Sequence, residues 1–120
     1  MTGPYMNLIV IRAEDLDRAK EFYERIGLKF QRHAHDTGPE HLASEMSSFV
    51  FEIYPIVEGQ PTTESTRIGF AVPDVDAVVE QLSIAGATIH RQPKDSPWGR
   101  RAVVRDFDKH LVELTQAELK

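Results

Sequence analysis

The segment "IVIRAEDLDRAKEFYERIGLKF", Ile9 to Phe30, decides the fold because its pattern occurs a second time in the chain. It aligns without a gap, at an offset of 59 residues, with "IGFAVPDVDAVVEQLSIAGATI", Ile68 to Ile89. Each copy reads as an apolar strand, an aspartate, an amphipathic helix, a glycine and another strand. The identical pairs are Ile9 and Ile68, Asp15 and Asp74, Asp17 and Asp76, Glu21 and Glu80, and Gly27 and Gly86. An internal repeat of this kind predicts two copies of one structural unit.

The two predicted helices begin at an aspartate and stop at a glycine. The carboxylates of Asp15 and Asp74 can accept the free N–H groups of a first helical turn. Gly27 and Gly86 stand where a left-handed residue ends a helix. Apolar residues recur at helical spacing in both copies, which predicts one buried face for each helix. These residues are Leu16, Ala19, Phe22, Tyr23 and Ile26, and Val75, Val78, Val79, Leu82 and Ala85.

Short strand-like runs follow each helix, so each half of the chain reads β-α-β-β-β. The runs are "LKFQRHAH", "HLASEM" and "SFVFEIYP" in the first half, and "TIHRQ", "RRAVVR" and "HLVELTQ" in the second. We predict an α+β fold in which the two modules form a cupped mixed sheet with the helices on the outer face. One domain then spans 1–120, with modules at about 5–56 and 67–117 and a polar linker at about 57–66. Each half is marginal as an independent unit, so the two must share buried surface.

Alternation along the strands assigns side chains to the two faces of the predicted sheet. The richer apolar faces should contact the helices. The opposite faces should line a concave surface that carries the apolar residues Leu8, Val10, Ala71 and Leu111 and the charged residues Glu52, Arg67 and Glu113. A carboxylate in the middle of an apolar strand, as Glu113 is, needs a partner that neutralises it.

Composition limits the classes of function. The net charge of −5 argues against nucleic-acid binding, which requires clustered Lys and Arg. The absence of cysteine excludes disulfides, zinc–thiolate sites and cysteine nucleophiles. No basic stretch with an apolar run opens the sequence, and no segment has the length of a membrane span. We therefore expect a cytoplasmic protein without nucleic-acid or membrane partners.

Three segments, taken in order, resemble the vicinal oxygen chelate superfamily. They are "DLDRAKEFYERIGLKF", "PDVDAVVEQLSIAGATI" and "SPWGRRAVVRDFDKHLVELTQ". This superfamily includes glyoxalase I, extradiol dioxygenases, fosfomycin-resistance enzymes and bleomycin-resistance proteins. The resemblance covers nearly the whole chain and implies the double-module fold. It also implies a homodimer in which paired modules complete the ligand clefts.

The resemblance implies four metal-ligand positions, one on each of four equivalent strands, and they fall on Leu8, Glu52, Arg67 and Glu113. Two of these positions cannot ligate a metal ion. Leucine offers no lone pair, and the protonated guanidinium of arginine offers only N–H groups, which donate hydrogen bonds. We therefore predict no metal and no other cofactor. Arg67 can instead pair with the two glutamates. The alternative is that Arg67 reaches solvent and the glutamates face a wet cleft.

Histidines offer a second set of candidate ligands. His33 and His35 share a strand face, and His41 lies near them if residues 36–40 form a turn. Three imidazoles can bind zinc; the alternative is a solvated hairpin. His90 and His110 are isolated, which favours structural or surface roles for both.

Two aromatic residues and one turn residue complete the list of candidates. Trp98 lies in a loop beside Gly99, where it can either plug the core or form a wall for a ligand. Tyr54, on the concave side of its strand, can form a second wall. Lys109 stands where the superfamily has a glycine. A left-handed conformation is costly for lysine, so the turn that sets the register of Glu113 can differ from the turn of the superfamily.

These observations favour a small-molecule-binding protein that is metal-free and holds its ligand in a concave cleft. The cleft residues are predicted to be Leu8, Val10, Glu52, Tyr54, Arg67, Trp98 and Glu113. One alternative is a glyoxalase-type lyase or dioxygenase with a rebuilt divalent-metal site. Another is a regulatory or structural module that binds a partner protein in the cleft. The sequence assigns no catalytic residue.

Overall fold

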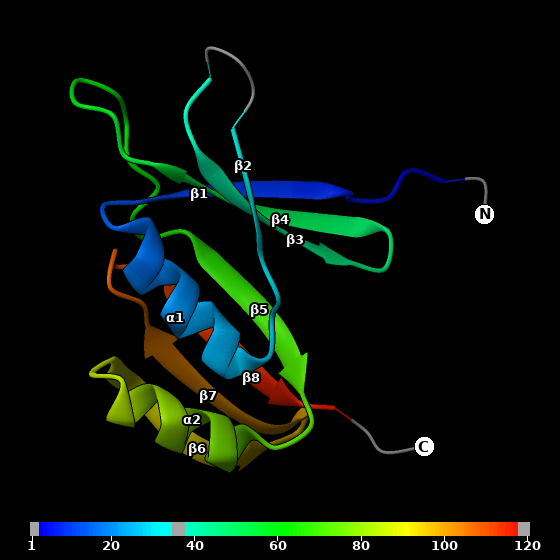
Figure 1. Ribbon diagram of the computed structural model, residues 1–120. Helices are drawn as coiled ribbons and strands as arrows, with labels where there is room; N and C mark the ends of the chain where they lie inside the picture. The colour runs from blue at the N-terminus through cyan, green and yellow to red at the C-terminus, as the bar shows by residue number, and fades with distance from the viewer. Residues whose placement is uncertain (1–2, 35–37, 118–120) are drawn as a thin grey trace.

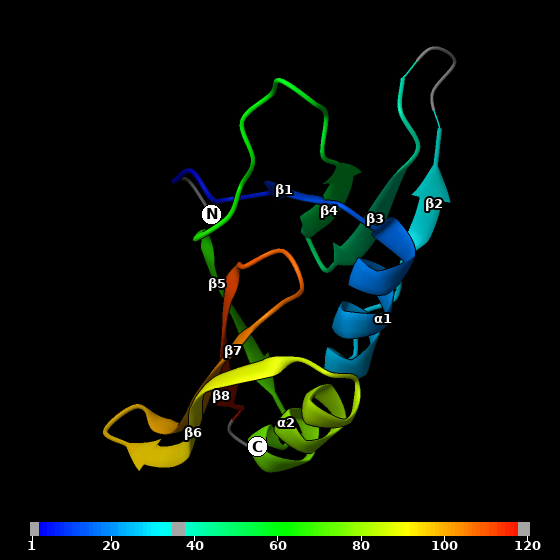
Figure 2. The same ribbon diagram turned by 90° about the vertical axis from the view of Figure 1, so that its left-hand side faces the viewer.

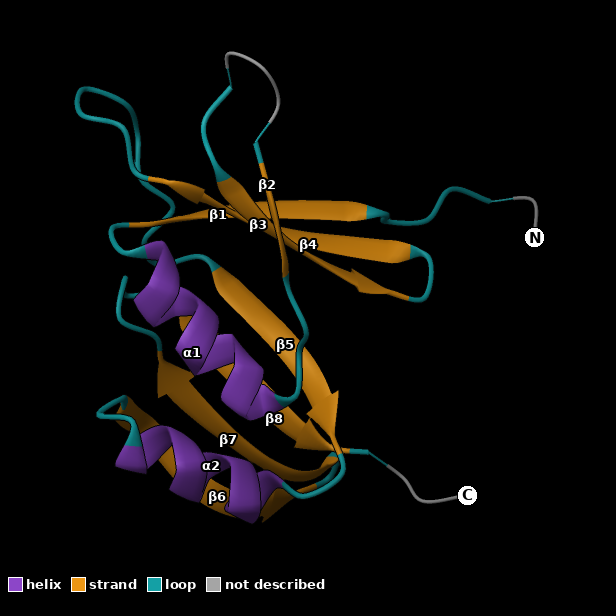
Figure 3. Cartoon of the chain, viewed as in Figure 1, coloured by secondary structure: helices purple, strands orange, loops and turns teal. Residues whose placement is uncertain are grey.

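Two β-α-β-β-β modules make up the computed structural model, which describes residues 3–34 and 38–117 (Figures 1 and 3). The first module contains β1 (Leu8–Ala13), α1 (Leu16–Ile26), β2 (Gln31–His33), β3 (His41–Met46) and β4 (Phe49–Pro55). The second contains β5 (Arg67–Val72), α2 (Val75–Ile84), β6 (Thr88–Ser96), β7 (Gly99–Arg105) and β8 (Leu111–Gln116). This confirms the predicted α+β fold with two modules.

Each module builds its own four-stranded mixed sheet. The strand order is β1-β4-β3-β2 in the first sheet and β5-β8-β7-β6 in the second. The pairs β1–β4 and β5–β8 are parallel, and the remaining pairs are antiparallel. The repeat in the sequence is therefore a repeat in topology, with β1 and β5 at equivalent sheet edges.

The helices begin at the predicted aspartates. The carboxylate Oδ1 of Asp15 accepts the N–H of Arg18 at 3.1 Å, and that of Asp74 accepts the N–H of Ala77 at 3.1 Å. Gly27 ends α1 with a φ of 121°. The second helix ends at Ala85, and Gly86 takes the positive φ of 95° one residue later. Within the described residues, neither helix is long and apolar enough to cross a bilayer.

One hydrophobic core joins the two modules. The ring of Phe51 on β4 lies 5.9 Å from that of Phe70 on β5, and Tyr23 of α1 lies 5.1 Å from Phe51. Helix α1 lies between the first sheet and α2 in Figure 2. The helix-facing sides of both sheets thus meet in the core, so their opposite sides point away from it. We call these opposite sides the first and second open faces.

A buried polar network also links the modules. The Tyr23 hydroxyl donates to Asp106 Oδ2 at 2.6 Å, and His110 Nδ1 lies 2.7 Å from the same oxygen. His110 Nε2 lies 2.7 Å from the hydroxyl oxygen of Thr63, which accepts the backbone N–H of Arg12 at 2.9 Å. All of these groups have partners when His110 carries its proton on Nδ1 and Thr63 donates to Nε2. His110 is fully buried, so its role is structural.

The environment of this network shifts two pKa values. Burial, together with the neighbouring Asp106 carboxylate, raises the pKa of Tyr23 well above its ordinary value. Burial alone would raise the pKa of Asp106 as well. The hydrogen bonds from His110 and Tyr23 outweigh that effect, and the pKa of Asp106 is lowered. Asp106 is therefore held as a carboxylate inside the protein.

The turn before β8 keeps a left-handed residue although it lacks the glycine. Asp106 Oδ1 accepts the N–H groups of Asp108 and His110, both at 2.9 Å, and Lys109 has a φ of 68°. A left-handed lysine costs on the order of 1 kcal/mol. The carboxylate of Asp106 organises the turn in spite of that cost, and Glu113 lies on the side of β8 opposite to the buried Val112 and Leu114.

Candidate functional site

The first open face carries apolar and aromatic side chains. Leu8 and Val10 on β1 are 48% and 37% exposed. Pairing with β4 sets Val10 beside Glu52 and Arg12 beside Tyr54. The guanidinium carbon of Arg12 lies 5.9 Å from the centre of the Tyr54 ring. Alternation along β1 and β4 predicts this grouping correctly, because one face of the sheet is buried.

Glu52 faces a histidine that the sequence had not linked to it. Its Oε2 lies 3.6 Å from Nε2 of His41. His41 is 2% exposed, and its ring stacks on Tyr54 with 4.2 Å between ring centres. The ring of His33 lies 5.8 Å from that of His41. His35 lies outside the described residues. The contact depends on the β3–β4 pairing, which the sequence does not reveal. This pairing sets Ala43 opposite Glu52 and so brings His41, two residues before Ala43, to the same face.

Two arginines neutralise Glu113 on the second open face. Nη2 of Arg67 lies 3.4 Å from Glu113 Oε1, and Nη2 of Arg101 contacts the same oxygen. Glu113 pairs across the sheet with Val103, and Arg101 occupies the next position on that side of β7. Alternation along "RRAVVR" could have identified Arg101 as a partner. The structure does not bring Glu52 into this group.

Trp98 is at the tip of the β6–β7 hairpin and is 79% exposed. The interpretation of Trp98 as a core plug is therefore wrong. The hairpin has two residues, Pro97 and Trp98, between the paired Ser96 and Gly99. Gly99 has a φ of 105°, so the tight turn holds the indole away from the core. A role as a ligand wall stays a prediction.

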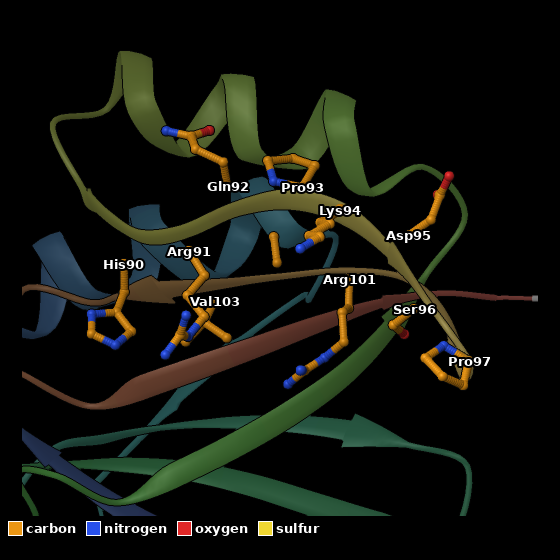
Figure 4. Close-up of a pocket in the computed structure, with 11 residues that line it drawn as sticks. His90, Arg91, Gln92, Pro93, Lys94, Asp95, Ser96, Pro97, Arg101 and Val103 are labelled. Atoms are coloured by element: carbon orange, nitrogen blue, oxygen red, sulfur yellow. The ribbon is translucent and has the colours of Figure 1, made fainter.

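A groove of about 800 Å³ runs along β6 and β7. Figure 4 shows Arg91, Lys94 and Arg101 projecting from these strands on the side opposite to α2. Val103 lies at its base and is 1% exposed. The groove is thus part of the second open face, and its size suits a small organic molecule.

Residues 5–114 match the family model of the Glyoxalase/Bleomycin resistance protein/Dioxygenase superfamily. The chain belongs to this superfamily. An uncharacterized protein of Mycolicibacterium smegmatis is 30% identical over 108 residues, which cover 88% of each chain. A glyoxalase/bleomycin resistance protein from Streptomyces sp. CB03234 is 26% identical and covers 93% of this chain and 100% of its own, with a TM-score of 0.72. The antibiotic-binding protein TnmS3 from the same source is 24% identical and has a TM-score of 0.76, with coverage of 98% and 99%.

The metal-ligand positions of the superfamily do not fit a metal ion in this chain. Leu8 has no donor atom, and Arg67 brings a positive charge to a site that would hold a cation. Glu113 is already engaged by Arg67 and Arg101. Between residues 3 and 117, leaving out 35–37, no three His, Asp or Glu side chains are grouped so that they could hold a metal ion.

Proposed function

We propose that the protein is a metal-free small-molecule-binding protein and acts as a homodimer. Its ligand is held between the first open face of one copy and the second open face of the other. The observation that carries this proposal is the position of the shared core. Because the helix-facing sides of the two sheets meet in that core, the two open faces of one chain point away from each other. A second copy can supply the missing wall.

The sheet edges support the dimer. Strands β1 and β5 each form the edge of a sheet, and a free edge can pair with another chain. Exposed apolar side chains accompany the first edge at Leu8 and Val10. An apolar groove of about 440 Å³, lined by Met6, Phe49 and Phe70 among others, lies beside both edges. A two-fold arrangement would bury these surfaces twice and create two equivalent clefts.

The chemistry of the cleft supports binding over metal-dependent catalysis. A hydrocarbon at Leu8 and fixed positive charges beside Glu113 replace donors that zinc or iron would need. Tyr54 and the apolar residues beside it provide surface for the body of an organic ligand. TnmS3, which has the same fold, is an antibiotic-binding protein, and this supports a small organic molecule as the ligand.

The proposal predicts that an uncharged aromatic probe, N-phenylnaphthylamine, binds in the cleft and becomes fluorescent. Because Trp98 is the only tryptophan, its emission should fall as the probe binds if the indole forms a wall of the cleft. Val10→Glu should weaken probe binding at least tenfold, since it places a charge on the apolar wall. Ile84→Glu is the matched control, because Ile84 is 67% exposed on α2, away from both open faces. An equal effect of the two substitutions would place the ligand elsewhere, and unchanged Trp98 emission would remove Trp98 from the site.

A further inference from the structure

We propose that the second open face binds the anionic group of an organic ligand, with Arg91 and Lys94 as the residues that hold it. The anionic group is a carboxylate, sulfonate or phosphate. This inference rests on the proposed function, because the second open face is one wall of the proposed cleft. To that function it adds the chemical class of the ligand, an organic anion.

Strand register concentrates positive charge on this face. Three successive rows of cross-strand neighbours run across β5, β8, β7 and β6. The rows are Arg67, Leu111, Arg105 and Thr88; Gly69, Glu113, Val103 and Arg91; and Ala71, Thr115, Arg101 and Lys94. Every row carries at least one cation, and Glu113 is the single carboxylate among these residues. Although the chain has a net charge of −5, this face is basic and therefore attracts anions locally.

Irregularities in β6 place Arg91 and Lys94 together on the open face. Residues three apart on a regular strand point to opposite sides. In β6 the register shifts between Ile89 and Arg91 and again between Arg91 and Lys94, so Arg91 is opposite Val103 and Lys94 is opposite Arg101. Pro93, which has no N–H for the ladder, lies in the second shift. Such bulges re-aim side chains next to functional sites.

Arg91 and Lys94 are available to a ligand because no carboxylate of the described residues holds them, unlike two of their cationic neighbours. Arg67 and Arg101 are paired with Glu113. The nearby Asp95 is paired with Arg100 at 3.1 Å. Throughout residues 3–34 and 38–117, no carboxylate lies within ion-pair distance of Arg91 or Lys94. The pair therefore offers unsatisfied donors that suit an oxyanion.

The groove also has an apolar floor, which favours an organic anion over an inorganic one. Val103 is buried on the open side, outside the main hydrophobic core, beside Arg91 and Arg101. A ligand with an apolar body and a charged end would contact this floor together with Arg91 and Lys94. The volume of about 800 Å³ suits a small molecule, and the acidic chain as a whole disfavours nucleic acid.

Two matched probes test the inference on the full-length protein. Anilinonaphthalene sulfonate carries an anionic group, and N-phenylnaphthylamine has the same rings without it. We expect Arg91→Gln and Lys94→Gln each to weaken sulfonate binding about tenfold or more and to leave the neutral probe within twofold. Lys20→Gln on α1 is the matched control and should change neither affinity. Added salt should weaken the sulfonate selectively.

The outcomes separate this inference from the proposed function. If both probes bind and the Arg91 and Lys94 substitutions affect them equally, the anionic class is wrong and the binding function stands. If Lys20→Gln weakens binding of the sulfonate probe as much as Arg91→Gln does, the probe responds to the total charge of the protein. The proposed site at Arg91 and Lys94 is then wrong. If neither probe binds the folded dimer, the proposed function itself fails.

Discussion

Replacing Asp106 with alanine is expected to lower the free energy of unfolding by about 3–5 kcal/mol, because it breaks a buried, charge-assisted network. The substitution removes the acceptor of the Tyr23 hydroxyl and of His110 Nδ1. It also removes the acceptor of two N–H groups in the turn before β8. Buried donors that lose their acceptor carry the full cost of desolvation. Urea unfolding followed by circular dichroism measures the loss.

Two comparisons show whether burial is the cause. Asp95→Ala removes a carboxylate whose side chain is 86% exposed, and it should cost less than about 1 kcal/mol. Tyr23→Phe removes only the hydroxyl that donates to Asp106 and should fall between the two, at about 1–2 kcal/mol. Equal losses for Asp106→Ala and Asp95→Ala would contradict the view that this network holds the two modules together.

The double substitution Leu8→His with Arg67→His is expected to create divalent-metal affinity, which the proposed metal-free function predicts the natural protein lacks. It adds two imidazoles at the positions where the superfamily places metal ligands and removes one of the cations beside Glu113. In the proposed cleft, Glu52 and Glu113 would complete the set of donors. We expect an increase in zinc or nickel affinity of at least a hundredfold, measured by calorimetry. Arg101→Ala in the same background should increase it further, since Arg101 also engages Glu113.

The double substitution Leu8→Gln with Arg67→Gln is the matched control, because it removes the same charge without adding imidazoles. It should bind metal no better than the natural protein. Stoichiometric metal in natural protein purified without a chelator would favour the alternative of a lyase or dioxygenase with a rebuilt site. His41 and Glu52, 3.6 Å apart, would then be the first candidate ligands. No gain in the histidine variant, with the fold intact, would contradict the proposed pairing of the open faces.

The sequence predicts those parts of the fold that depend on local chemistry. Asp15 and Asp74 mark both helix starts because a capping carboxylate contacts an N–H only three residues away. The open faces follow from alternation, since a strand has a period of two. Val10 and Glu52 could therefore be assigned to one surface before their pairing was known.

Contacts between distant segments could not be predicted in the same way. Tyr23 fits the apolar pattern of α1, and nothing near it in the sequence points to its bond with Asp106, 83 residues further along the chain. The pairing of His41 with Glu52 depends on which strands are neighbours and in which register. Pro93 was a visible signal of irregularity in β6, but the resulting direction of Lys94 depends on where the bulge falls.

The cleft shared between two copies is the central claim, and cross-linking between single-cysteine variants tests it most directly. The chain has no cysteine, so Leu8→Cys and Arg67→Cys each introduce one unique thiol. The two variants are refolded together, so that mixed dimers form, and treated with a short bis-maleimide. We predict a covalent dimer in the mixture and none in either variant alone, because the proposed cleft sets Leu8 of one copy opposite Arg67 of the other. The absence of a covalent dimer, when sedimentation shows that the mixture is dimeric, would contradict the shared cleft. Sedimentation that shows only monomer at micromolar concentration would contradict it as well.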